Sequence, residues 1–282
     1  MKRLLKKILL NFRKLPLFIE PKIDKLFLSP DVPMPSLVSH ANWPRYLYEI
    51  GNKPGMKILE IGSREETERL NARKNFGQAE YIGFDYYAGD NVDVVGDAHK
   101  LSSYFKGEER FDFVFSSACF EHFAMPWIVA VEIAKVLKLG GYVFVETHFS
   151  YSSHGRPWNF FQFSDMGLKV LFSEALGFEC IEAGMSNPIV GRFSSLADTY
   201  LRGRPVDGLY CHSEYFGTKR REIRNFNWEQ VDIASVVEGT RYPEPKAESI
   251  PAATATPEGS GKEGPLPDSN ATGSNGVGEH CH

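Results

Sequence analysis

Residues 57–63 read KILEIGS, a short apolar run that ends in a glycine and a serine. A run of this length predicts a buried β-strand over 57–61, which the chain enters through the turn formers Pro54 and Gly55. From about residue 54 to 185, such runs alternate with longer amphipathic stretches, as is typical of βαβ units and a mostly parallel sheet. The sequence therefore predicts an α/β fold.

The same alternation predicts the individual elements. Strands are expected over residues 57–61, 81–85, 92–95, 111–117, 142–147, 178–183 and 209–216. Helices are expected over residues 65–74, 127–137, 165–176 and 193–201. Pro126 fits the first turn of the second helix, and Gly140-Gly141 is expected to end it. Ser164 is the expected N-cap of the third helix and Gly177 its end.

Composition divides the chain into three parts. Residues 1–30 carry a net charge of +6, whereas the whole chain of 282 residues carries −4, so the remainder is acidic at −10. An acidic body argues against a general nucleic-acid binder, whose domain is expected to be basic. Residues 246–282 contain no Phe, Trp or Tyr and cannot bury enough apolar area to offset their chain entropy. We therefore expect a basic N-terminal arm over 1–30, a folded domain over 31–245 and a disordered tail over 246–282.

The arm contains an amphipathic pattern. Its apolar residues fall on one helical face, so a short helix that ends before Pro16 is expected over residues 1–14. Two interpretations stay open: the helix lies on an anionic membrane surface, or it packs on the protein body or frays. The sequence has no apolar stretch of about 18 residues to span a membrane, and its four cysteines lack paired spacing. We expect a cytoplasmic protein, either free or peripheral at the inner face of the membrane.

Acidic and small residues follow the predicted strands at the edge where ligands of open parallel sheets bind. Gly62 follows the first strand, and Asp85 ends the second strand 23 residues further on. An acid at this place accepts hydrogen bonds from ribose hydroxyls in nucleotide-binding βαβ units. Asp97 follows the third strand, where a carboxylate can accept from the exocyclic amine of adenine. Asp85 alone is as well explained as a turn or cap residue, and a glycine after a strand is common, but the three together indicate an adenosine ligand.

The residues around Gly62 narrow the choice of ligand. The diphosphate-binding pattern G-x-G-x-x-G is missing, because Ser63, Arg64 and Glu65 follow Gly62. This disfavours NAD and FAD. Acids at the start of a helix also repel phosphate, whereas a ligand with an amino-acid ammonium group fits beside Glu60.

Residues 45–245 resemble the class I S-adenosylmethionine-dependent methyltransferases. LEIGS at 59–63 is similar to their first motif, with Arg64 or Glu65 where a further glycine is usual. Glu121-His122, Pro126 and the string AKVLKLGG at 134–141 resemble the EH…P…RVLKPGG stretch of the small-molecule, type 11-like subgroup.

This resemblance implies a Rossmann-like fold with a seven-stranded, mostly parallel sheet and helices on both faces. It also implies an enzyme with S-adenosyl-L-methionine as cofactor. The cofactor-binding residues that it implies are Glu60, Gly62, Ser63, Asp85, Tyr86, Asp97, Ala98, Ser116, Ser117 and Ala118.

A narrower resemblance concerns the acceptor. Residues 148–164 resemble the H..P.D(Y/F)FRF(S/T) segment of bacterial methyltransferases in surface-glycan pathways, with Asn159 and Gln162 in place of the usual Asp and Arg. It implies O-methylation of a sugar hydroxyl on a glycan or glycolipid precursor, in polysaccharide biosynthesis. The aromatic residues of 151–163 either form a wall over such an acceptor or build core. No basic-and-aromatic stripe suggests a nucleic-acid acceptor.

Histidines are the candidate catalytic residues. Methyl transfer from a sulfonium is an in-line displacement, which requires alignment and exclusion of water but no covalent nucleophile. A hydroxyl acceptor is helped by a base, and histidine suits neutral pH. His148, just past the fifth strand, is the first candidate, with His122 and His154 behind it. For each of them a buried structural role is the alternative.

No metal site is expected. Some quinone-pathway O-methyltransferases bind a metal through a Glu-x-x-Glu-His stretch, but the first position of that stretch is Ala118 here. A metal at Glu121-His122 is therefore disfavoured unless other ligands take part.

Two functions of different classes remain. One is a methyltransferase, and the other is a non-catalytic scaffold on the same fold that its basic arm recruits to membranes or partners. We favour the enzyme because the strand-end acids and the Glu121-His122 segment occur together, and a scaffold needs neither.

Overall fold

The computed structural model describes residues 25, 28–29, 31–65, 72–106, 110–232 and 235–236. The chain divides into two units, Met1–Gly239 and Thr240–His282, and all described residues belong to the first. The predicted amphipathic helix over 1–14 and the predicted tail over 246–282 therefore lie outside the described residues. Within the described part, no helix is both long and apolar enough to cross a membrane.

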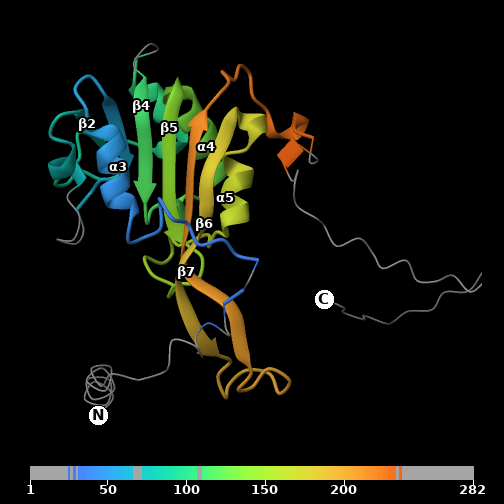
Figure 1. Cartoon of the computed structure of the whole chain (residues 1–282). Coiled ribbons are helices and arrows are strands. Elements are labelled where there is room, and N and C mark those ends of the chain that lie inside the picture. Colours follow the sequence, from blue (N-terminus) through green and yellow to red (C-terminus); the bar gives the residue numbers. More distant parts are fainter. Residues whose placement is uncertain are drawn as a thin grey trace, which may run out of the picture. The chain divides into compact units, whose positions relative to one another are not determined.

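The described part contains a seven-stranded sheet of order β3-β2-β1-β4-β5-β7-β6 (Figure 1). The strands are β1 (Lys57–Ile61), β2 (Glu80–Asp85), β3 (Val94–Val95), β4 (Phe111–Ser117), β5 (Leu137–His148), β6 (Phe178–Arg192) and β7 (Pro205–Lys219). All neighbours from β3 to β5 pair in parallel, whereas β7 pairs antiparallel with both β5 and β6. The predicted seven-stranded, mostly parallel sheet is confirmed.

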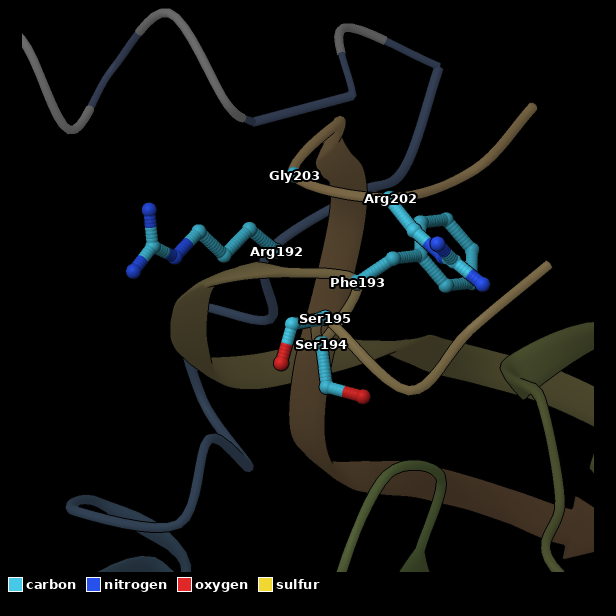
Figure 2. A pocket seen from close by; sticks show the side chains of 6 residues that line it. All are labelled: Arg192, Phe193, Ser194, Ser195, Arg202 and Gly203. Carbon is cyan, nitrogen blue, oxygen red and sulfur yellow. The ribbon is translucent and has the colours of Figure 1, made fainter. Parts of the chain in front are cut away.

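The segment between β6 and β7 differs from the expectation of a helix over 193–201. β6 and β7 instead form a long hairpin, in which the Phe193 amide donates to the Arg204 carbonyl at 3.0 Å. The hydrogen bonds between the two strands thus extend to Phe193 and Arg204. The residues between these two form turns instead of the expected helix. The hairpin continues past β5, whose pairing with β7 ends at His148 (Figure 1). A cavity of about 650 Å³ at its tip is lined by Arg192, Phe193, Ser194, Ser195, Arg202 and Gly203 (Figure 2).

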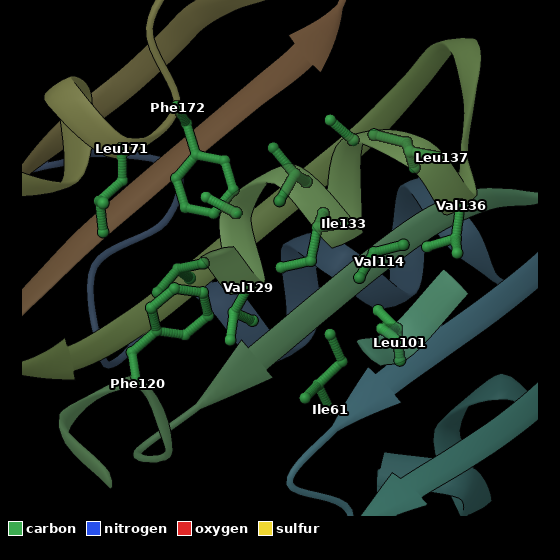
Figure 3. Close-up of a cluster of buried hydrophobic side chains, with 14 of the residues drawn as sticks. Ile61, Leu101, Val114, Phe120, Val129, Ile133, Val136, Leu137, Leu171 and Phe172 are labelled. Atoms are coloured by element: carbon green, nitrogen blue, oxygen red, sulfur yellow. The ribbon is translucent and has the colours of Figure 1, made fainter. Parts of the chain in front are cut away.

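Helices cover both faces of the sheet, as predicted. They are α3 (Trp43–Gly51), α4 (Pro126–Val136) and α5 (Asp165–Leu171). Strand β4 shows how side chains alternate between the faces: Phe113 and Phe115 join the apolar cluster that includes residues of α3, whereas Val114 joins the one that includes residues of α4 and α5. Figure 3 shows this second cluster. The sheet is thus a central layer between two apolar cores.

The expected helix boundaries are partly wrong. α4 ends at Val136 and β5 follows at once, so Gly140-Gly141 does not stop the helix but lies within β5. There Gly140 has φ +79°, next to the register shift in the β4–β5 pairing. Glycine is needed at this irregularity because its backbone enters the left-handed region.

The predicted N-cap of the third helix is confirmed, but the helix is shorter than expected, and Gly177 caps the 3-10 turn that follows it instead of the helix itself. Ser164 Oγ accepts from the Gly167 amide at 3.1 Å, and Gly177 has φ +88°. α5 ends at Leu171, and a 3-10 turn over Glu174–Leu176 follows. The first predicted helix, over 65–74, falls largely on residues outside the description; Glu65 is not helical, and a 3-10 helix spans Ala72–Phe76.

A fully buried lysine fastens β7 to the end of α4. Lys219 Nζ donates to the carbonyl oxygens of Ala134 at 2.8 Å and Leu137 at 2.9 Å, and it lies 2.8 Å from a carboxylate oxygen of Glu222. Burial lowers the pKa of Lys219, while Glu222 opposes this shift. Carbonyl oxygens at the end of a helix lack intrahelical partners, so the ammonium group caps α4.

We expect Lys219→Met to lower the free energy of unfolding by about 2 to 3 kcal/mol, because charged hydrogen bonds to buried carbonyls are lost. The control is Lys138→Met, which breaks a half-exposed ion pair with Asp112 and should cost under about 1 kcal/mol. Urea denaturation of both variants measures the difference. Equal losses would show that Lys219 contributes no more than a surface ion pair.

Candidate active site

The ends of β1, β2 and β3 are tied together by backbone hydrogen bonds. The amides of Gly62 and Ser63 donate to the Phe84 carbonyl at 2.9 and 3.2 Å, and the Gly96 amide donates to the Asp85 carbonyl at 2.9 Å. Gly62, Asp85 and the residue after Gly96 therefore lie at the carboxyl edge of three neighbouring strands. The structure brings together the residues that were predicted to surround an adenosine.

Gly62 allows the loop after β4 to approach β1. It has φ +84°, and a Cβ atom there would lie 2.7 Å from Cys119 Sγ. The same loop is held from both sides: Ser116 Oγ donates to the Ile61 carbonyl at 2.9 Å, and the Ala118 amide donates to the Glu146 carbonyl at 3.0 Å. The close approach that the glycine predicts is thus made by Cys119 of the chain itself.

Asp85 is held by its own loop. Its carboxylate accepts from the amides of Arg64 at 3.2 Å and Tyr87 at 3.0 Å, and it lies 3.6 Å from Arg64 Nε. Arg64 stands where the methyltransferases that this chain resembles usually have glycine. Its backbone amide and its guanidinium group both face Asp85, the residue predicted to bind the ribose. The neighbouring Tyr86, also predicted to contact cofactor, is largely exposed. A ribose hydroxyl that binds Asp85 must share or displace these donors.

Asp97 caps the 3-10 helix Ala98–Tyr104. Its carboxylate accepts from the His99 amide at 3.0 Å and lies 2.7 Å from His99 Nδ1. Burial acts to raise the pKa of Asp97, but the hydrogen bonds from His99 outweigh it and hold the pKa below its usual range. Asp97 therefore serves as an N-cap, a role that the sequence analysis did not assign to it, at the strand edge where the adenine is expected.

Glu60 is a half-buried acid on β1. Its carboxyl group accepts a hydrogen bond from the Tyr81 hydroxyl. Burial raises the pKa of Glu60 to about 8, although Asn91 and Arg73 oppose the shift. A cationic group placed beside Glu60 would favour its charged form, which agrees with the expected ammonium partner.

The three predicted catalytic histidines meet around one acid, Glu121. This residue is fully buried in the 3-10 turn Phe120–His122. Glu121 Oε1 lies 2.6 Å from His148 Nδ1, 3.8 Å from His154 Nε2 and 4.0 Å from His122 Nε2. Sequence reasoning used Glu121 only as part of a motif, and its adjacency to His122 was the signal that could have marked it.

The other oxygen of Glu121 accepts from Thr147 Oγ1 at 2.6 Å. Burial acts to raise the pKa of Glu121, but the His148 imidazole and the Thr147 hydroxyl outweigh it and lower the pKa below its usual range. The carboxylate is therefore held in one orientation, with Oε1 toward the histidines.

A second cluster of polar side chains, formed by His40, Glu146 and His212, lies next to the cluster of Glu121 and its three histidines. Glu146 of β5 contacts His40 Nδ1 at 2.8 Å and accepts from Ser117 Oγ at 2.9 Å, so the predicted cofactor residue Ser117 is bonded within the chain. The ring of His40 stacks on that of His212 at 4.1 Å. His212 in turn lies 5.5 Å from His148, centroid to centroid. The two groups are therefore continuous.

The aromatic residues of 151–163 divide between the two roles considered for them. Phe161 and Phe163 pack into the apolar core. Tyr151, Trp158 and Phe160 are exposed, and the Tyr151 ring stacks on His148 at 4.4 Å. Only the second set is available to contact an acceptor.

We expect Gly62→Ala to destabilise the fold more than Gly55→Ala. Both glycines have nearly the same φ, +84° and +83°, but a Cβ atom at Gly55 meets nothing within 4 Å. Gly55→Ala should cost about 1 to 2 kcal/mol of backbone strain, and Gly62→Ala about 1 to 3 kcal/mol more because of the overlap with Cys119. Chemical denaturation measures both, and equal costs would contradict the tight contact.

Glu214 should make stability depend on pH. Burial raises its pKa to about 8, against 4.5 for the free group, despite hydrogen bonds from Ser186 Oγ and the His40 amide; Glu146 lies opposite it on β5. Between these values the folded chain keeps a proton that the unfolded chain releases, so the free energy of unfolding falls as pH rises from 4.5 to 8.

Glu214→Gln should reduce this fall, because the amide does not ionise. The pKa of Glu60 is raised as well, so Glu60 also makes the free energy of unfolding fall as pH rises, and this part of the fall should remain. The exposed Glu80→Gln is the control, and urea denaturation between pH 5 and 9 is the measurement. If Glu214→Gln leaves the slope at its wild-type value, Glu214 does not hold the proton.

Comparison with known proteins gives one family. The family described as "Methyltransferase domain" matches residues 38–183, just over half of the chain. None of the curated proteins matches.

Solved structures share a similar fold. They include a SAM-dependent methyltransferase from Archaeoglobus fulgidus (18% identity, 62% of this chain and 92% of that one, TM-score 0.45) and YcgJ from Bacillus subtilis (16%, 63% and 98%, 0.44). A third is 1,6-didemethyltoxoflavin-N1-methyltransferase from Burkholderia thailandensis, with S-adenosylhomocysteine bound (14%, 63% and 76%, 0.44). At these values they add nothing to the family assignment. It rests on the match over residues 38–183, and by that match the chain belongs to the family of methyltransferase domains.

Proposed function

We propose that this methyltransferase transfers the methyl group of S-adenosyl-L-methionine to a hydroxyl of a sugar in a glycan or glycolipid precursor. The observation that carries the proposal is the position of His148. It lies 2.6 Å from the buried Glu121 on one side and stacks beneath the exposed ring of Tyr151 on the other. Polar groups suited to receive a proton thus adjoin an aromatic surface suited to a sugar.

Family membership supports S-adenosyl-L-methionine as the methyl donor. The chemistry of the strand-end residues fits this cofactor. Asp85 has carboxylate oxygens that accept from ribose hydroxyls, and Asp97 with Ala98 lies where an adenine can be bound. Glu60 supplies a carboxyl group that an ammonium group would ionise. The cofactor supplies an activated methyl group on a sulfonium.

The acceptor is held by the loop between β5 and α5. The Phe160 amide donates to the Glu121 carbonyl at 2.9 Å, and the Gln162 amide group bonds both backbone groups of Tyr151. These contacts fix the exposed aromatic side chains of the loop beside the histidines. A hydroxyl on a sugar that stacks there loses its proton to the group formed by Glu121 and its histidines.

The full chain, incubated with methyl-labelled S-adenosylmethionine and a panel of nucleotide-linked sugars and glycolipid precursors, should label a sugar oxygen. Mass spectrometry and NMR of the product locate the methyl group. S-adenosylhomocysteine at 100 times its Kd should stabilise the fold by about 2.7 kcal/mol, and Asp85→Ala should abolish this, whereas Asp90→Ala, which removes an exposed acid of the same loop, should not.

Three outcomes would each overturn part of the proposal. No stabilisation of the wild-type chain by either ligand would favour the scaffold, for which the Arg64–Asp85 contact is the structural support. A methyl group on nitrogen or carbon would exclude the hydroxyl. Labelling of acceptors without sugars alone would exclude the glycan.

A further inference from the structure

Three imidazoles surround a single carboxylate oxygen. Glu121 Oε1 lies within 4.0 Å of a ring nitrogen from each of His148, His154 and His122. Glu121 is fully buried and His148 is 8% exposed, whereas His154 is partly accessible to solvent. A charged carboxylate in such a place needs compensation by a nearby positive charge.

Hydrogen bonds at the Nδ1 atoms of His154 and His122 determine whether their Nε2 atoms, which lie nearer Glu121, carry a hydrogen or a lone pair. His154 Nδ1 lies 3.0 Å from the Ser152 carbonyl, and His122 Nδ1 lies 2.7 Å from the Trp158 carbonyl. A carbonyl only accepts, so each Nδ1 carries the hydrogen, and in a neutral ring Nε2 then presents a lone pair. Two lone pairs therefore face the Glu121 oxygen, which is itself an acceptor.

The third imidazole, that of His148, lies closest to Glu121. His148 Nδ1 and Glu121 Oε1 are 2.6 Å apart, yet both atoms are buried without a properly oriented hydrogen bond. Glu121 Oε2, by contrast, accepts from Thr147 Oγ1 at 2.6 Å. Glu121, His122 and His154 are thus each held by a hydrogen bond on the side away from the centre, as the ligands of bound metal ions are.

We propose that Glu121, His148 and His154 bind a divalent transition-metal ion, for which Zn²⁺ is the best fit. One donor atom of each residue lies within 4.8 Å of those of the other two. Two imidazoles and a carboxylate are the protein ligands of several catalytic zinc sites, which keep a fourth position open. Zn²⁺ with bonds of about 2.0 to 2.1 Å separates its ligand atoms by about 3.3 Å, so His148 and Glu121 move apart slightly and His154 moves in.

This inference revises the expectation of no metal. That expectation rested on Ala118, which offers no ligand three residues before Glu121. His148 comes from the end of β5 and His154 from the following loop, and neither is recognisable as a ligand from spacing near Glu121. The site deepens the proposed function, on which its role rests: the open position would hold the acceptor oxygen and lower its pKa, and His122, which is not a ligand, would take the proton.

The adjoining group of His40, Glu146 and His212 also brings three potential ligands together. It lacks the features above, because Glu146 bonds to His40 and Ser117, and the two imidazoles stack face to face at 4.1 Å. Nitrogens in the planes of stacked rings do not converge on one point. This group therefore provides the matched control.

Binding of Zn²⁺ alone is measured on the full chain after removal of metal with a chelator, by competition with a chromogenic chelator. His280, Cys281 and His282 are replaced by Ala in every sample, since the tail offers ligands of its own. One ion per chain is expected. His154→Ala should weaken binding at least about 100-fold and Thr147→Val about 10- to 100-fold, whereas His40→Ala should change it less than twofold. Co²⁺ in place of Zn²⁺ should give visible absorption that His154→Ala abolishes.

Failure to bind one ion at micromolar Zn²⁺ would overturn the proposal, with a proton then holding the charge beside Glu121. Binding that survives His154→Ala, or that His40→Ala removes, would overturn it as well. Stabilisation by S-adenosylhomocysteine in the metal-free chain is measured in parallel. If the ion fails to bind and this stabilisation persists, the metal site alone is wrong and the proposed cofactor stands.

Discussion

The antiparallel insertion of β7 between β5 and β6 is the constraint on which the candidate site depends. In this register His148 lies opposite His212, and Glu146 opposite Glu214. A slip of β7 by one residue would turn His212 and Glu214 to the other face of the sheet. At the other end of β7, Lys219 is fixed by the carbonyl oxygens at the end of α4. The buried ammonium group and the polar site therefore stabilise the same register.

The acids at the ends of the strands have one property in common. The carboxyl group of each already contacts a hydrogen-bonding group of the same chain. Asp85 has Arg64, Asp97 has His99, and Glu60 has Tyr81. A nucleoside bound as proposed would exchange these contacts for its own, and such exchanges change the free energy of binding by only about 0.5 to 1.5 kcal/mol per hydrogen bond. Selectivity therefore comes from how many acceptors a ligand satisfies at once. A ligand with both ribose hydroxyls and an ammonium group satisfies the most.

Strands predicted from apolar runs agree with the structure where the sequence marks both ends of the run clearly. β1 and β4 begin and end at the predicted residues, because charged or small residues bound each run. Gly140-Gly141 misled the prediction, since glycine marks a bulge within a strand as readily as the end of a helix. α3 was not predicted, because it precedes the alternation of strands and helices. Its Trp43 and Leu47 nevertheless pack on the sheet.

The meeting of Glu121 with His148 could not be read from sequence, because it depends on how β4 and β5 pair. Ser117 lies opposite Glu146 in that pairing, so the turn after β4 comes beside the last residues of β5. His40 arrives from still further away, ahead of α3. The sequence identified His148, His122 and His154 as candidates but not His40, and only three-dimensional contacts show which acid each histidine meets.

The two histidine groups show that residue type alone does not decide the chemistry. Both contain a glutamate and two or three imidazoles. In the Glu146 group a ring nitrogen bonds to the acid, and the hydrogen bond raises the pKa of His40. In the Glu121 group backbone carbonyls bind the Nδ1 atoms of His122 and His154, which leaves Nε2 toward the acid. A proton between His40 and Glu146 satisfies the first arrangement, whereas the second offers the ligands of the proposed metal ion. The outer hydrogen bonds, which lie away from the centre, are therefore the reason why we propose the ion for the Glu121 group.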